Sequence, residues 1–182
     1  ERAIEIVNRA VEIFDETIYV KHEVVHNKHV IEQLVEKGVV FVESLDNVPD
    51  QSILIYSAHG VSKEISELAS LKKLKVFDAT CPLVTKVHFE IHKFASQNID
   101  VVLVGHSGHP EVEGTMGQYI SDKGKIHLVE TNDDIDKLQI ENQDLAYVTQ
   151  TTLSVDDTKS IVSSLKLKFP NIIGPRKDDI CY

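Results

Sequence analysis

The chain has 182 residues, of which 42% are apolar and 26% are charged, a composition that excludes wholesale disorder and collagen-like structure. Its formal net charge of −10 disfavours nonspecific binding to nucleic acid, because that binding needs clustered lysine and arginine. No apolar run approaches the ~20 residues that a membrane-spanning helix requires, and residue 1 opens a helical pattern rather than a signal segment. We therefore expect no nucleic-acid partner and no membrane span.

Short apolar runs alternate with helical patterns from one end of the chain to the other. Strands are expected at residues 18–21, 39–42, 52–56, 74–77, 100–104, 126–129, 145–148 and 171–173. Helices are expected at residues 2–14, 28–37, 62–71, 82–97 and 155–168, and another should begin at Pro110. This alternation is typical of parallel sheets covered by helices. The expected fold class is α/β, with two parallel-sheet lobes over residues 1–80 and 81–175.

Unusual polar segments follow six of the predicted strands. They are HEVVHN at 22–27, SAHG at 57–60, DATCP at 78–82, GHSGHPE at 105–111, TQTT at 149–152 and, a few residues after the last strand, IC at 180–181. In open α/β sheets, ligands bind beyond the carboxyl ends of the strands. We therefore expect one shared site at these strand ends, containing two thiols, several imidazoles, a carboxylate and hydroxyls.

The two cysteines, Cys81 and Cys181, are one hundred residues apart, and neither belongs to a CxxC pair. A chain of this size needs no disulfide, so we expect a reducing, cytoplasmic compartment. Cys81 precedes Pro82, a favoured first residue of a helix, where a thiolate is stabilised and could bind an iron–sulfur cluster. Taken alone, either cysteine is more readily explained as an inert buried thiol.

The histidines and Glu111 are the other candidates for chemistry. His59 precedes Gly60, which lets a ligand approach the backbone. His106 and His109 bracket a glycine turn before a helix start, an arrangement suited to an anion. Glu111 could transfer a proton or could simply pair with the helix dipole, and both interpretations stay open. The threonines at 149–152 could equally be ordinary strand residues.

Two patterns suggest a metal other than iron. HEVVH at residues 22–26 matches the zinc-peptidase motif, in which two histidines lie on one face of a helix. The preceding strand and Asn27, a suitable helix cap, instead favour a turn between strand and helix. His88 and His92 are four residues apart on a predicted helix, but no third ligand is evident, so we expect no metal there.

Taken together, six segments of the chain resemble the 4-hydroxy-3-methylbut-2-enyl diphosphate reductases, a LytB-type family of iron–sulfur enzymes. The segments are HEVVHNKHV, SAHGVS, DATCPLVTKVH, GHSGHPEVEGTMGQ, TQTTLSVDDT and GPRKDDICY, in this order. The resemblance implies a three-lobed α/β protein around a 4Fe–4S cluster, with residues 176–182 beginning the third lobe. It makes Cys81 and Cys181 cluster ligands. The family's third cysteine would precede Glu1, so we expect this chain to be an inactive piece of a longer enzyme.

The resemblance also implies roles for other residues. His26, His59 and His109 would bind the diphosphate, Glu111 would donate a proton, and Thr151 would position the substrate hydroxyl. The reaction would remove an allylic hydroxyl from a small allylic diphosphate, with electrons from a ferredoxin- or flavodoxin-type donor. The remaining alternatives are a zinc hydrolase using the HEVVH motif and a diphosphate- or nucleotide-binding module. The sequence contains no P-loop and no G-x-G-x-x-G motif, which argues against the binding module.

Overall fold

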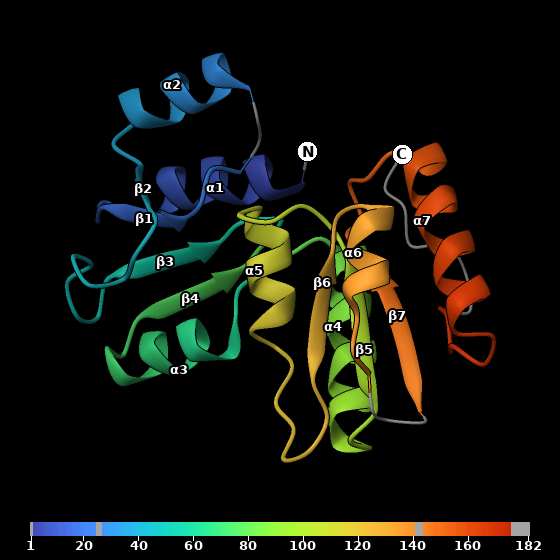
Figure 1. Cartoon of the computed structure of the whole chain (residues 1–182). Helices are drawn as coiled ribbons and strands as arrows, with labels where there is room; N and C mark the ends of the chain where they lie inside the picture. Colours follow the sequence, from blue (N-terminus) through green and yellow to red (C-terminus); the bar gives the residue numbers. More distant parts are fainter. Residues whose placement is uncertain (1, 25–26, 141–143, 176–182) are drawn as a thin grey trace. The chain divides into compact units, whose positions relative to one another are not determined.

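Parallel strands and helices alternate along the chain, as the sequence pattern predicts, and the α/β fold class is confirmed (Figure 1). The computed structural model describes residues 2–24, 27–140 and 144–175. The chain divides into two units, Glu1–Cys81 and Pro82–Tyr182, each with its own sheet.

The first unit is a four-stranded parallel sheet with strand order β2-β1-β3-β4. Its strands are β1 (Ile18–Lys21), β2 (Val40–Val42), β3 (Ile53–Tyr56) and β4 (Lys75–Asp78). The helices are α1 (Arg2–Ile13), α2 (Lys28–Glu36) and α3 (Lys63–Leu71). Lys21 of β1 is in register with Val42 and with Tyr56, and Tyr56 is in register with Asp78. The four strands therefore end together, and the segments that follow them emerge from one edge.

Alternating side chains of this sheet form two cores. One core joins Val20 and Ile55 to Val7 of α1 and Leu34 of α2. The other joins the opposite face to Ala69 of α3. Because strands covered on both faces are apolar along their length, β3 reads as the continuous run ILIY.

The second unit is a three-stranded parallel sheet with strand order β6-β5-β7. Its strands are β5 (Asp100–Val104), β6 (Ile126–Val129) and β7 (Leu145–Thr149). Its helices are α4 (Pro82–Ser96), α5 (Pro110–Met116), α6 (Asn132–Lys137) and α7 (Val155–Lys168). The strand expected at residues 171–173 is reduced to a single bridge between Ile173 and Ala146.

Helices cover both faces of the second sheet. Helices α4 and α5 pack on one face, where Ile91 and Val112 meet Leu103. Helices α6 and α7 pack on the other face, where Ile135 and Leu165 join the core. The start of α5 and the start of α7 therefore lie on opposite faces of this sheet, although both follow strand ends at its carboxyl edge.

Helix α6 was not expected from the sequence. It has only six residues, and Ile135 is its one buried side chain, so it carries no apolar periodicity. Its start is held by Asp134, whose carboxylate accepts hydrogen bonds from the backbone and the hydroxyl of Thr131. These bonds lower the pKa of Asp134 to about 2. Local polar contacts, rather than a hydrophobic stripe, define this helix.

Candidate functional site

In the first unit, the segments after β3 and β4 lie side by side. The Ala79 amide donates to the Tyr56 carbonyl, and the Cys81 amide donates to the Ala58 carbonyl at 3.0 Å. Cys81 is therefore held against the segment that carries His59. The Nδ1 atom of His59 is 3.3 Å from the Oγ atom of buried Ser57. Two of the predicted site residues, His59 and Cys81, thus share one edge of the sheet.

Cys81 is half-buried, forms no disulfide and directly precedes Pro82, the first residue of α4. The first amides of a helix point toward its start and favour negative charge there. A thiolate in this position suits an iron–sulfur cluster. Within residues 2–24, 27–140 and 144–175, no group of three His, Cys, Asp or Glu could hold a metal ion. Cys181 and His26 lie outside the described residues.

In the second unit, Glu111 and Thr151 are bound to each other across the carboxyl edge of the sheet. The Oε1 atom of Glu111 accepts from the Thr151 amide at 2.6 Å, and Oε2 accepts from the Thr151 hydroxyl at 3.0 Å. Both residues are only 2% exposed. Burial raises the pKa of Glu111 above its usual value, and the two bonds from Thr151 partly oppose that rise. The protonated form of Glu111 is therefore favoured more strongly in this site than it would be in water.

His109 caps the start of α5. Its Nδ1 atom accepts a hydrogen bond from the Glu111 amide at 3.1 Å. An accepting nitrogen carries no proton, so the ring proton of the neutral imidazole resides on Nε2. The His109 ring thus holds the backbone of Glu111 through Nδ1, and its Nε2–H group can donate a hydrogen bond. Gly108, with φ of 76°, shapes the turn before it.

Gln150 holds the two strand ends of this site together, and the sequence analysis did not single it out. Its Oε1 atom accepts from the His106 amide at 2.9 Å, and its Nε2 atom donates to the Thr152 hydroxyl at 2.8 Å. Gly105 allows this close approach, since a Cβ there would lie 2.6 Å from Val112 Cγ2 and 3.1 Å from Gln150 Oε1. The signal in the sequence was the position of Gln150 between two threonines at a strand end. A glutamine that is buried there must find hydrogen-bond partners for its side-chain amide.

The segment after β1 does not form a zinc site. His22 adopts a left-handed φ of 64°, residues 22–24 are not helical, and α2 begins only at Lys28. His22 therefore does not lie on a helix, as the zinc-peptidase motif requires, and the zinc-peptidase interpretation is wrong. The predicted cap is confirmed, because Asn27 Oδ1 accepts from the amides of His29 and Val30. His22 instead contacts Lys21 and Glu43.

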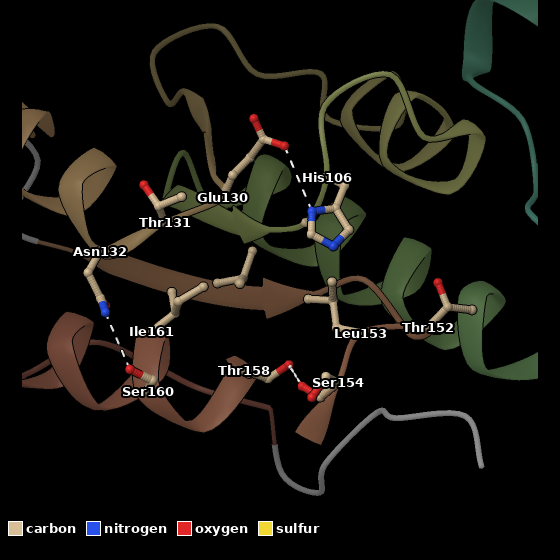
Figure 2. Close-up of a pocket in the computed structure, with 12 residues that line it drawn as sticks. His106, Glu130, Thr131, Asn132, Thr152, Leu153, Ser154, Thr158, Ser160 and Ile161 are labelled. Carbon is tan, nitrogen blue, oxygen red and sulfur yellow. Dashed lines mark hydrogen bonds and ion pairs between the residues drawn. The ribbon is translucent and has the colours of Figure 1, made fainter. Parts of the chain in front are cut away.

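A pocket of about 350 Å³ opens at the carboxyl edge of the second sheet, on the face covered by α6 and α7 (Figure 2). Hydroxyl and amide side chains dominate its lining, which includes Thr131, Asn132, Thr152, Ser154, Thr158 and Ser160. His106 and Glu130 lie on its rim, 3.9 Å apart between Nδ1 and Oε1. Glu111 and His109 do not line it, because α5 lies on the opposite face. The pocket is thus distinct from the Glu111–Thr151 pair.

The chain is similar to proteins of known activity along its whole length. The family model described as LytB protein matches residues 1–182. The 4-hydroxy-3-methylbut-2-enyl diphosphate reductase of Methylococcus capsulatus is 62% identical, over 100% of this chain and 58% of the relative. The enzyme of the same name from Nitrosomonas europaea is 58% identical, over 100% of this chain and 57% of the relative.

Solved structures agree with these relatives. The E-1-hydroxy-2-methyl-but-2-enyl-4-diphosphate reductase from Plasmodium falciparum superposes with a TM-score of 0.93 at 48% identity, covering 100% of this chain and 56% of that one. A second structure, of the terminal enzyme of the non-mevalonate pathway, gives a TM-score of 0.83 at 30% identity, covering 99% and 63%. The chain spans somewhat more than half the length of these relatives. Among the helices described here, none is long and apolar enough to cross a membrane.

Proposed function

The chain belongs to the LytB family, and from that premise we propose that it forms two lobes of a 4-hydroxy-3-methylbut-2-enyl diphosphate reductase. The reaction removes the allylic hydroxyl as water, consumes two electrons and two protons, and yields isopentenyl and dimethylallyl diphosphate. The match of all 182 residues to the family model carries this proposal. The geometry of Glu111 and Thr151 supports it, because the reaction needs a proton donor.

Glu111 is the proposed proton donor. A hydroxyl leaves an allylic carbon readily only when a proton converts it to water, and a positioned acid supplies that proton. Burial raises the pKa of Glu111, so its acid form persists to higher pH than it would in water. The amide and hydroxyl of Thr151 hold the two carboxyl oxygens and fix the direction of transfer. Thr151 is therefore both the positioning group for the acid and the proposed contact of the substrate hydroxyl.

His26, His59 and His109 are the proposed diphosphate ligands. Charge-assisted hydrogen bonds from imidazoles are strong and directional toward phosphate oxygens. His109 supports this role through its geometry, because its Nδ1 atom is engaged by the Glu111 amide and its donor lies on Nε2. An anion bound there is placed close in sequence and in space to the acid. The His59 ring is oriented by the Ser57 hydroxyl, whose Oγ atom lies 3.3 Å from Nδ1.

The electrons require a redox group, for which the family resemblance implies a 4Fe–4S cluster. Cys81 fits one ligand position, since it forms no disulfide and directly precedes α4, and Cys181 is the second proposed ligand. When bound, the cluster would supply electrons and a Lewis-acidic iron for the hydroxyl oxygen. We infer a ferredoxin- or flavodoxin-type protein as the electron donor and the reducing cytoplasm as the compartment. A chain of this size with two cysteines one hundred residues apart does not depend on a disulfide, which supports the assignment of the compartment.

The test is anaerobic reconstitution with iron and sulfide of the full-length protein to which we assign this chain. A brown protein that reduces 4-hydroxy-3-methylbut-2-enyl diphosphate with a chemical electron donor supports the proposal. A colourless protein without bound iron, or a coloured protein without turnover, contradicts it. The 182-residue chain, assayed in parallel, is expected to be inactive, because it supplies two of the three cysteine thiolates that the family resemblance implies for the cluster.

A further inference from the structure

A buried glutamine, Gln150, directly follows β7 at the carboxyl edge of the second sheet. It is 3% exposed, and its backbone amide donates to the Val104 carbonyl at 2.8 Å, which continues the pairing of β7 with β5. Its side-chain Oε1 atom accepts from the His106 amide at 2.9 Å. The backbone and the side chain of this one residue therefore bind the β5 end on both sides of Gly105.

The Gln150 side chain fits its place closely and is held in one orientation. A Cβ atom at Gly105 would lie 3.1 Å from Gln150 Oε1 and 3.3 Å from Gln150 Cβ, so the side chain lies in the space that the glycine leaves open. A backbone amide only donates, so the atom that meets the His106 amide is the carbonyl oxygen. The Nε2 atom then donates to the Thr152 hydroxyl at 2.8 Å. Both ends of the buried side-chain amide are thus bonded, as burial requires.

The turn that Gln150 holds is the one that carries His109 and Glu111. The His106 carbonyl accepts from the His109 amide at 3.2 Å, and His109 Nδ1 accepts from the Glu111 amide at 3.1 Å. The carboxyl group of Glu111 is bonded in turn by the amide and the hydroxyl of Thr151, the residue after Gln150. The contacts therefore form a closed ring that begins and ends at adjacent residues of the β7 end.

The same turn has a second anchor, which differs from Gln150 in its exposure to water. Glu130 Oε1 accepts from the Ser107 amide at 2.7 Å, and the Glu130 side chain is 40% exposed. Water can take the place of an exposed acceptor at little cost, whereas a buried amide that loses its bonds is costly. Gln150 is therefore the stronger determinant of where the turn lies.

We propose that Gln150 is a positioning residue for the reaction, which holds the turn at residues 105–109 so that His109 and Glu111 stay in one arrangement. This inference rests on the proposed function, in which His109 binds the diphosphate and Glu111 donates the proton. Gln150 acts through the His106 amide and not on the substrate. Because one turn carries both groups, loosening it should change the affinity for the diphosphate and the chemical step together.

The experiment compares Gln150→Met with wild type in the reconstituted full-length protein. Methionine keeps the length of the side chain and removes both polar atoms. We expect kcat to fall about 10- to 100-fold and KM for the substrate to rise about threefold or more. Ser121→Ala is the matched control, because Ser121 Oγ accepts from the Gly124 amide at 3.0 Å in the turn before β6, at the opposite edge of the sheet. It should leave kcat and KM unchanged.

Non-additivity distinguishes positioning of the acid from a general loss of structure. In a Glu111→Gln background, Gln150→Met should lower kcat by less than about threefold, because the acid that Gln150 positions is already absent. KM should still rise in that background, because His109 is displaced in both. A loss of kcat as large as in the wild-type background overturns the positioning of Glu111.

A second measurement needs no variant. In the reconstituted wild-type protein, amide hydrogen exchange should be slow at His106, whose amide donates to Gln150, and at Thr151, whose amide donates to Glu111. Fast exchange at His106 overturns the hold of Gln150 on the turn even if Gln150→Met fails to fold.

The outcomes separate this inference from the proposed function. A wild-type protein that reduces the substrate, while Gln150→Met keeps either its kcat or its KM, overturns the role of Gln150 alone. A wild-type protein that binds inorganic pyrophosphate without reducing the substrate contradicts the proposed function. In that case calorimetry decides the role of Gln150, because an unchanged pyrophosphate Kd in Gln150→Met overturns it. A wild-type protein that binds no pyrophosphate overturns both.

Discussion

The two units have the same parallel layout but different chemistry at their carboxyl edges. The edge of the first sheet carries the thiol of Cys81 beside the His59 segment. The edge of the second sheet carries the Glu111–Thr151 pair, with His109 at the start of α5. Under the proposed function, the first unit supplies a thiol ligand and the second unit supplies the proton. Each unit contributes a histidine to the diphosphate.

Replacing the sulfur of the first edge should have the largest effect. Cys81→Ser removes a soft thiolate ligand, and serine is a poor ligand for iron–sulfur clusters. We expect the reconstituted full-length protein to lose most of its iron, its visible absorption and all measurable turnover. Iron content and absorption spectra report this directly. A serine variant that keeps a full complement of iron would remove Cys81 from the ligand set.

Replacing the acid of the second edge should preserve the redox group. Glu111→Gln keeps the shape of the side chain but cannot donate a proton, so turnover should fall by about 10²- to 10⁴-fold. Iron content and substrate KM should stay close to wild type. If the affinity for substrate collapses instead, Glu111 is a binding residue, and the division between the two edges does not hold.

A smaller effect is expected from the partner of the acid. Thr151→Val removes the hydroxyl bond to Glu111 Oε2 and keeps the amide bond to Oε1. That hydroxyl bond lowers the pKa of Glu111, so its loss should raise the pKa further. The alkaline limb of the pH–rate profile should therefore move to higher pH, and turnover should fall about tenfold. Thr151→Ser, which restores a hydroxyl, should recover both; a serine variant as impaired as valine would argue against the hydroxyl.

The smallest effect concerns stability. Because burial raises the pKa of Glu111 above the ordinary value of 4.5, the folded state favours the protonated acid. This contribution is complete below that pH and is lost as pH rises through the folded-state pKa. The free energy of unfolding of Glu111→Gln should match wild type near pH 4 and exceed it increasingly toward neutral pH. Urea unfolding at several pH values measures this difference, and a constant difference would show that the acid titrates normally.

The fold class follows from sequence patterns, but the details of the site follow only partly. Apolar runs alternate with helical patterns along most of the chain, so the parallel sheets are strongly determined. Helix α6 escapes this reasoning because aspartates at its start, rather than an apolar stripe, stabilise it. The polar segments at strand ends were visible because a run such as GHSGHPE interrupts an apolar pattern.

Contacts between distant positions could not be read from the sequence. The bond between Glu111 and Thr151 joins residues forty positions apart, and the amide of Gln150 reaches a segment forty-four positions away. HEVVH shows the converse problem, since a five-residue motif predicts a helix face that the backbone at His22 does not adopt. The contact between His22 and Glu43 depends on the parallel register of β1 and β2, for which the sequence contains no direct indication.

The absent side chain at Gly105 has a consequence for how this family can vary. A methyl group there would press on Val112 of α5 and on the Gln150 amide at once, although neither is a neighbour in sequence. Drift at position 105 therefore requires a compensating reduction elsewhere, and Gly105→Ala becomes tolerable only together with a change such as Val112→Ala. A library that varies this chain should therefore change the two positions together, because a side chain at 105 alone is strained against Val112.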